Sequence, residues 1–452
     1  MKRSGYTNLF VLLMAMIIGD VNGCIFRPHG PIDFAGGTQV ILADYQGSDP
    51  TGAPPEVAGA GLVARGEYLA RAADCIGCHT TPLGKPFAGG LAFKLPLGTL
   101  YSTNITPDKK TGIGEWTDNE FVKAMHEGIG RNGSRLYPAF PYNAYTLLTR
   151  NDVLAIKAYL FTLKPVHATP PENDMAFPFN QRYLMGFWNV LYNPAERFRP
   201  NIDRPPSWNR GAYLTEALGH CGECHTPRTL LQGLDSDKKF GGAMIEGWKA
   251  YNMTSDHRSG IGTWSDDELV EYLSTGHAEG RSTAAGPMAL VFNKSLRFLT
   301  RDDIRAMAEY LKTVPPLHDQ DDLAVTQPRV SAPLSEARLR GRQGPAGIDD
   351  DLGLRVFQGA CASCHDWDGS GVHSPYADLT GSRTVNDPSG VNTTQVILEG
   401  ASLLTRQGDM FMPAFGTAYS NTEIAAVVNY VTGRFGVGAS TMTPHQVAKL
   451  RK

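Results

Sequence analysis

Cys221-Gly222-Glu223-Cys224-His225 is the stretch that decides how this sequence folds, because the same pattern occurs three times. Cys75-Ile76-Gly77-Cys78-His79 precedes it, and Cys361-Ala362-Ser363-Cys364-His365 follows it. C-x-x-C-H is the attachment signal for c-type haem. The two cysteines form thioethers with the porphyrin vinyl groups, and the adjacent histidine becomes the proximal iron ligand. The sequence therefore predicts three covalently bound haem c groups, with His79, His225 and His365 as iron ligands.

A structural zinc site or a redox dithiol is the alternative for a C-x-x-C pair. Zinc needs four ligands, which often come from two such pairs close together. Here the motifs stand 146 and 140 residues apart, and a histidine directly follows each pair. This spacing favours haem over zinc.

Length and composition agree with three domains. The chain has 452 residues, and domains usually contain about 100–200. The formal net charge is −3, so no strong positive field indicates a nucleic-acid partner. The motifs use six of the seven cysteines and leave only Cys24, so no disulfide is expected.

The first 23 residues have the features of an export signal. Lys2 and Arg3 precede an apolar run at residues 9–18, and Val21-Asn22-Gly23-Cys24 resembles a bacterial lipobox. Lipidation of Cys24 and ordinary signal cleavage nearby both remain open. No later segment has the ~18–20 apolar residues that cross a bilayer. We expect the chain on the periplasmic side of the cytoplasmic membrane, with Cys24 as a candidate lipid anchor.

The fold class expected is all-α, with three tandem cytochrome c domains joined by irregular, proline-rich connections. In each domain a helix leads into the CxxCH motif and a terminal amphipathic helix packs on it. The expected boundaries are a signal peptide at 1–23, an extended leader at 24–60, domains at 61–164, 209–314 and 350–436, linkers at 165–208 and 315–349, and a tail at 437–452.

An internal repeat supports this division. Asn104-Ile105-Thr106-Pro107-Asp108 returns as Asn252-Met253-Thr254-Ser255-Asp256. A helix with a capping box follows each, at Thr117 with Glu120 and at Ser265 with Glu268. Closing helices are expected at 148–160, 299–311 and 421–431.

The second axial ligand decides what each haem can do, because a methionine thioether raises the potential and blocks substrates. Met412 is the candidate in the third domain, with Met410 as its competitor, and Met288 is the candidate in the second. The corresponding position in the first domain is Phe140, which cannot bind iron. His126 is another candidate there, so the first haem is either five-coordinate or bound by an unassigned ligand.

These motifs resemble the three-haem cytochrome c subunits of membrane-bound periplasmic dehydrogenases that oxidise alcohols, aldehydes, gluconate or fructose. The resemblance covers residues 60–450 and rests on the CxxCH sites, Asn104-Ile105-Thr106-Pro107-Asp108, Arg210-Gly211-Ala212-Tyr213-Leu214, Gly286-Pro287-Met288 and Met412-Pro413-Ala414-Phe415. In that family the first-domain loop carries a methionine where this chain has Phe140. Phe140 and Phe177-Pro178-Phe179-Asn180 are more similar to relatives partnered with molybdenum-containing aldehyde or N-heterocycle dehydrogenases.

The resemblance implies an electron-transfer subunit that is not itself catalytic. It would receive electrons from a dehydrogenase of the molybdenum, pyrroloquinoline quinone or flavin type and pass them to ubiquinone or a terminal oxidase at the membrane surface. The sequence shows no phosphate-binding glycine loop, nucleophile elbow or catalytic triad. The alternatives are a haem enzyme, such as a peroxidase or reductase working at an open first haem, and a free periplasmic electron shuttle.

Overall fold

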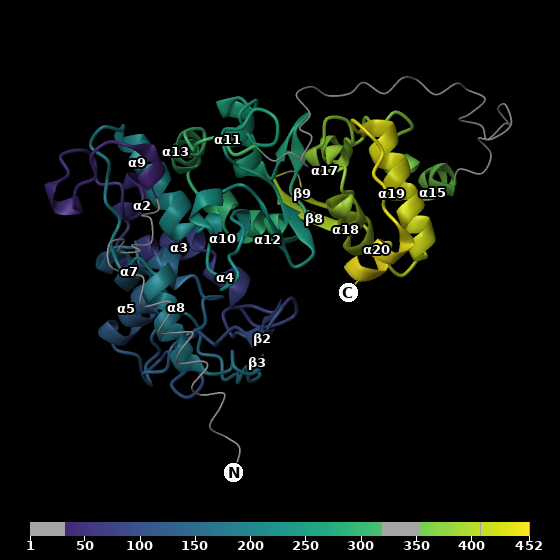
Figure 1. The fold of residues 1–452 in the computed structure, drawn as a ribbon. Helices are drawn as coiled ribbons and strands as arrows, with labels where there is room; N and C mark the ends of the chain where they lie inside the picture. Colours follow the sequence, from purple (N-terminus) through teal and green to yellow (C-terminus); the bar gives the residue numbers. More distant parts are fainter. Residues whose placement is uncertain (1–31, 319–351, 407, 452) are drawn as a thin grey trace, which may run out of the picture.

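Three helix pairs of the same construction recur along the chain (Figure 1). In each pair a helix that leads into a CxxCH motif packs against a helix near the end of the same unit. The computed structural model describes residues 32–318, 352–406 and 408–451, so the signal peptide, Cys24 and most of the expected linker at 315–349 lie outside the described residues. The pairs are α3 (Leu62–Ala72) with α7 (Arg150–Leu160), α9 (Pro206–Ala212) with α13 (Arg301–Leu311), and α15 (Leu352–Ala360) with α19 (Asn421–Phe435).

A glycine sits where the two helices of each pair cross. A Cβ atom on Gly66, Gly211 or Gly353 would overlap the carbonyl oxygen of Ala155, Ala306 or Ala426, respectively. The next close atom in each pair is the Cβ of a tyrosine one turn later, at Tyr159, Tyr310 or Tyr430. The repeat therefore encodes the same close backbone approach three times, because only glycine leaves room for it.

The third pair offers a matched test of this crossing. We expect Gly353→Ala to lower the free energy of unfolding by about 1–3 kcal/mol, the usual cost of overpacking. Gly359 lies in the same helix but has open space around its Cα. Gly359→Ala should therefore raise stability by about 0.5–1 kcal/mol through helix propensity alone. Thermal unfolding of both holoprotein variants measures the difference, and equal effects would contradict the crossing geometry.

The remaining elements of the three units are short and lie between the paired helices, except for α20, which follows α19. The first unit contains α4 (Cys75–Cys78), β1 (Ala92–Leu95), β2 (Gly98–Tyr101), α5 (Asp118–Glu127) and α6 (Tyr142–Tyr145). The second contains the π-helical turn η4 (Tyr213–Leu218), α10 (Gly222–His225), η5 (Ser236–Lys238), β4 (Ala243–Ile245), β5 (Trp248–Ala250), α11 (Asp266–Thr275), β6 (His277–Ala278), β7 (Ser282–Thr283), α12 (Gly286–Lys294) and η6 (Leu296–Phe298). The third contains α16 (Ala362–His365), η7 (Pro375–Ala377), α17 (Arg383–Asn386), α18 (Val391–Glu399), β8 (Ala401–Thr405), β9 (Gly408–Met412) and α20 (Pro444–Leu450).

The described chain is mostly helical, and its strands form small antiparallel hairpins such as β4–β5 and β8–β9. The predicted capping boxes are confirmed at the starts of α5 and α11. The Thr117 and Ser265 side chains accept hydrogen bonds from the backbone N–H groups of Glu120 and Glu268, whose side chains accept from the backbone N–H groups of Thr117 and Ser265. Thr149 and Thr300 are the N-caps of α7 and α13, and their side chains accept hydrogen bonds from the backbone N–H groups of Asp152 and Asp303. No helix in the described ranges is long and apolar enough to span a bilayer.

The first and second units exchange a pair of buried hydrogen bonds. Tyr68 of α3 donates to Asp303 of α13 at 2.6 Å, and Tyr213 of η4 donates to Asp152 of α7 at 2.5 Å. Arg210 adds two bonds to the Asp303 carboxylate, at 2.8 and 2.7 Å. The attachment helix of each unit, which is the helical segment that leads into its CxxCH motif, is thereby fixed to the closing helix of the other unit. One hydrophobic core runs through both units.

The third unit has its own hydrophobic core, around Phe357 and Val428. It nevertheless docks on the second unit through backbone-to-side-chain hydrogen bonds. Asn392 of α18 bonds both backbone groups of Lys249 at 2.8 Å, and Asn293 of α12 bonds the backbone of Ser402 and Leu404. Figure 1 shows this unit at one side of the molecule, beyond α12.

The two segments outside the helix pairs are packed against the body of the molecule. Residues 165–208 contain β3 (Asp174–Met175), which pairs with β2, followed by η3 (Arg182–Leu184) and α8 (Met185–Tyr192) with its buried Trp188. Residues 32–58, expected to be extended, contain η1 (Asp33–Ala35), η2 (Leu42–Asp44) and α2 (Pro55–Ala58). The carbonyl groups of Pro50 and Gly52 accept hydrogen bonds from Arg210, so this leader contributes to the contact between the first two units.

Candidate functional site

Each CxxCH motif forms one short helical turn directly after its attachment helix. The first occupies α4, and the second and third occupy α10 and α16. All six cysteines are unpaired thiols, and five of them are partly buried, whereas Cys364 is exposed. Burial is the main cause that raises the pKa of Cys75 to about 12 and of Cys224 to about 11. No group of three or more metal-ligating side chains gathers within the described ranges.

The three histidines share one hydrogen-bond arrangement. The Nδ1 atoms of His79, His225 and His365 lie 2.6, 2.7 and 2.6 Å from the carbonyl oxygens of Thr103, Tyr251 and Ala377. Because a carbonyl oxygen only accepts, Nδ1 carries the hydrogen and Nε2 keeps its lone pair for a metal. Burial lowers the pKa of all three rings and favours the neutral form that binds iron. The geometry of the chain thus fits axial ligation of a haem at every motif.

The accepting carbonyls are held by the repeated segments that follow each motif. Asn104 Oδ1 accepts from the backbone N–H of Thr106 at 2.9 Å and from its hydroxyl at 2.7 Å. Asn252 and Thr254 repeat these two bonds at 2.9 and 2.7 Å. The repeat seen in the sequence therefore fixes the backbone one residue before each asparagine, which is where the histidine partner lies.

The third unit builds the same turn from different residues. Asp378 Oδ1 accepts both bonds from Thr380, each at 2.7 Å, and Ala377 precedes it. The sequence alone assigned no role to these carbonyls or to Asp378. The spacing of Asp378-Leu379-Thr380 after His365 was the available signal, but its length and composition differ from those of the asparagine repeats.

Of the two candidate methionines, Met412 lies beside the motif of its own unit. Met412, at the end of β9, lines a small cavity together with Cys361. Met410 is paired with Leu403 across the β8–β9 hairpin instead. Met288 lies in the first turn of α12, where it packs on the same core as Cys221. The placement of Met412 supports its assignment, and the assignments of both methionines stay predictions.

The first unit has Phe140 at the position that corresponds to the candidate methionines of the other two units. Phe140 packs on the shared core, with its ring centroid 5.6 Å from that of Tyr145. Burial lowers the pKa of His126 to about 4, and the groups that act on its ring are Arg197, Arg150 and the Leu148 backbone. These neighbours belong to α7, the turn before it and the 165–208 segment, and none of them belongs to the first motif.

The first and second motifs lie next to each other. The Tyr145 ring is 5.5 Å from that of His220, and its hydroxyl donates to the carbonyl of Ala73 at 2.9 Å. Burial raises the pKa of Cys78, and charge on Cys224 adds to the effect, which places these two sulfurs within electrostatic range of each other. Cys78 and Cys224 would hold groups of the first and second motifs, and single-electron transfer is the chemistry that haem would supply there.

Comparison with known proteins agrees with this geometry. The chain is 37% identical over 441 residues to the gluconate 2-dehydrogenase cytochrome c subunit of Pantoea cypripedii, covering 94% of this chain and 93% of that one. It belongs to the family of dehydrogenase cytochrome c subunits. The fructose dehydrogenase cytochrome subunit of Gluconobacter japonicus is also 37% identical, over 89% of this chain and 85% of its own.

Two further matches cover parts of this chain. The family model for cytochrome c matches residues 63–164 and 351–434. A nicotinate dehydrogenase subunit of Pseudomonas putida is 39% identical over 84% of this chain, which corresponds to 31% of that longer protein. The cofactor of the family is covalently bound haem c, whose iron accepts and releases single electrons. This cytochrome subunit is therefore an electron-transfer component of a dehydrogenase complex.

Proposed function

We propose that this cytochrome subunit carries three haem c groups, one in each of three cytochrome c domains, and conducts electrons away from a catalytic dehydrogenase. The observation that carries the proposal is the threefold Nδ1–carbonyl arrangement, which prepares His79, His225 and His365 in the same way beside three cysteine pairs. Met288 and Met412 would complete the second and third sites. Neutral thioether ligands keep substrates off these irons and limit the rearrangement that accompanies each electron.

The partner is the second part of the proposal. All three relatives described above carry dehydrogenase names. Phe140 and the Phe177-Pro178-Phe179-Asn180 segment resemble cytochromes that serve molybdenum-type aldehyde or N-heterocycle dehydrogenases, and the identity to a nicotinate dehydrogenase component supports the same class. We propose that class of partner, with pyrroloquinoline quinone and flavin enzymes as the alternatives. Ubiquinone or a terminal oxidase would accept the electrons at the periplasmic face of the membrane, with Cys24 as the anchor.

A second candidate function rests on Phe140. A first haem without a methionine opposite His79 would leave an open coordination position, which a peroxidase or reductase could use.

One preparation tests the two functions together. The full chain is produced in its own host and purified from detergent-solubilised membranes. We expect it to co-purify with a large dehydrogenase and the substrate of that enzyme to reduce its haem absorbance. Cys24→Ser should move the complex to the soluble fraction without changing this reduction. A chain that purifies alone and turns over peroxide, with carbon monoxide bound to the reduced protein, would overturn the subunit proposal and favour the haem enzyme.

A further inference from the structure

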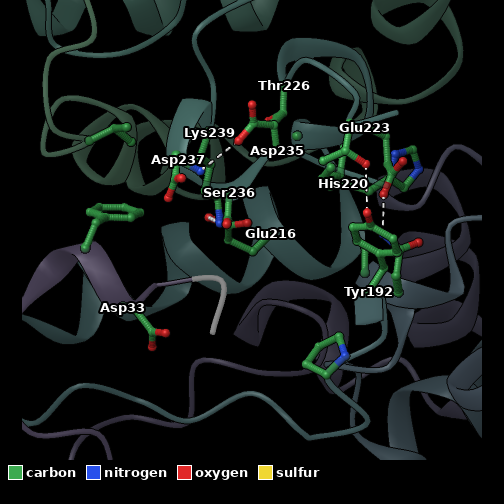
Figure 2. Close-up of a pocket in the computed structure, with 18 of the residues that line it drawn as sticks. Asp33, Tyr192, Glu216, His220, Glu223, Thr226, Asp235, Ser236, Asp237 and Lys239 are labelled. Carbon is green, nitrogen blue, oxygen red and sulfur yellow. Dashed lines mark hydrogen bonds and ion pairs between the residues drawn. The ribbon is translucent and has the colours of Figure 1, made fainter. Parts of the chain in front are cut away.

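A cleft of about 810 Å³ opens between the first and second units, on the outer side of the second attachment motif. Its walls come from α6, the turn η4, α10 and the segment around η5. Figure 2 shows Glu216, Lys239 and Asp237 toward one side of the cleft and Tyr192, His220 and Glu223 toward the other. The cleft gives solvent a path to charged groups that are otherwise inside the protein.

Glu216 is the most deeply placed of these groups. Its side chain is only 6% exposed, and it lies in the π-helical turn that leads to Cys221. Its Oε1 atom is 2.6 Å from Lys239 Nζ and also accepts a hydrogen bond from the Tyr310 hydroxyl. Tyr310 belongs to α13, the closing helix of the same unit. The cluster therefore joins three elements around one carboxylate.

This cluster is close to the second haem attachment. Charge on Glu216 raises the pKa of Cys221, and charge on Cys221 raises that of Tyr310. The backbone N–H of Cys221 also donates a hydrogen bond to the carbonyl oxygen of Thr215 at 3.1 Å, which ties the motif to the turn that carries Glu216. Charges interact strongly at such a site, because the effective dielectric constant inside a protein is far below that of water.

The other two units have no equivalent. Five residues after the crossing glycine, the first unit has Arg71 and the third has Gln358, where the second has Glu216. Lys239 precedes Phe240, and Pro86 precedes the corresponding Phe87. The closing tyrosines are present in all three units. The buried carboxylate and its lysine are therefore additions to one haem site, and helix packing does not require them.

We propose that Glu216 is a proton-binding site coupled to the second haem. The inference rests on the proposed function. When an electron from the dehydrogenase reduces the second iron, the Glu216 carboxylate takes up a proton from water in the cleft. When the electron leaves, the proton returns to the water. The charge added to the buried site is thereby balanced, while Tyr310, whose pKa is raised by burial, keeps its hydroxyl proton.

Opposing effects act on the pKa of the Glu216 carboxyl group. Burial raises its pKa, while Lys239 and the Tyr310 hydroxyl hold it down. The other titratable groups on the cleft are Asp33, His220, Glu223, Asp235 and Asp237. Glu223 is paired with Arg228 at 2.6 Å and Asp235 with Lys238 at 3.8 Å. Neither carboxylate contacts Tyr310 or the π-helical turn in the way that Glu216 does, and this makes Asp235 a suitable control.

The test is a spectroelectrochemical titration of the full holoprotein between about pH 5 and 9. The second haem is assigned as the one whose potential falls in Met288→Leu. Below the titration window Glu216 is protonated in both redox states, and above it Glu216 is ionised in both. Within the window reduction takes up a proton, so the potential should fall as pH rises. The limit is 59 mV per pH unit, the value of a tenfold change for one electron.

Three variants decide the outcome. Glu216→Gln should abolish the slope and remove a carboxylic acid C=O band from the reduced-minus-oxidised infrared spectrum, whereas Asp235→Asn should keep both. Tyr310→Phe removes one hydrogen bond to the anion, so it should move the titration window to higher pH. If Glu216→Gln does not fold, this shift in Tyr310→Phe tests the inference instead. A flat wild-type profile, or a slope that survives in Glu216→Gln, overturns the inference. Absence of a second haem from the spectrum would instead contradict the proposed function.

Discussion

Replacing both Cys361 and Cys364 with alanine should yield a protein that retains two of its three covalent haems. The third unit has a hydrophobic core of its own, so loss of its haem should leave the other two sites intact. The mass of the purified chain and its pyridine haemochrome absorbance per polypeptide measure the number of haems. Cys24→Ser is the control and should leave the count at three, because Cys24 belongs to no attachment motif.

The same change in the first motif should have a wider effect. The first two units share one core, and their attachment helices exchange the Tyr68–Asp303 and Tyr213–Asp152 hydrogen bonds. A Cys75→Ala, Cys78→Ala double variant should therefore lower the occupancy of the second site as well, or fail to accumulate. Equal losses from all three double variants would argue against this division of the molecule, and an unchanged count would refute haem attachment at the altered motif.

Met412→Leu should lower the potential of the third haem by on the order of a tenth of a volt or more. Axial ligands set haem potentials over a range of about 0.8 V, and a thioether opposite histidine favours the ferrous state. Leucine keeps the side-chain volume similar and so separates loss of the ligand from loss of packing. Redox titration followed in the visible spectrum measures the shift, and carbon monoxide should bind the reduced variant at the new open position.

Met410→Leu is the matched control for this experiment. Met410 lies on the same strand, two residues earlier, but does not line the cavity that Met412 shares with Cys361. We expect its potentials to match those of the wild type. A large shift in Met410→Leu with none in Met412→Leu would reverse the assignment.

Much of the local structure could be predicted from the sequence. Closing helices were expected at 148–160, 299–311 and 421–431, and they occupy Arg150–Leu160, Arg301–Leu311 and Asn421–Phe435. The capping boxes predicted at Thr117 and Ser265 likewise mark the starts of α5 and α11, since such signals act over three or four residues. Short strands near the motifs were not expected. Hairpins such as β4–β5 have only three residues per strand, too few for an alternating pattern to be recognised.

The sequence did not predict which residues far apart in the chain contact one another. The Arg-Gly-x-Tyr-Leu repeat was visible before Cys221, but nothing in its spacing shows that Tyr68 bonds Asp303, 235 residues away. The sequence also predicted no role for Glu216, because a single glutamate in a helical stretch usually faces solvent. Only its burial beside Lys239 and Tyr310 gives it a role.

The sequence by itself predicts where haem is attached, because the thioether bonds and the proximal histidine depend on five adjacent residues and on nothing distant. It also determined the helix that precedes each motif and the one that closes each unit. The tertiary structure alone decided which carbonyl orients each histidine, how the first two units interlock, and which carboxylate is buried beside the second site. These features depend on groups far apart in the chain, whose meeting is fixed by packing of the whole molecule and not by local pattern.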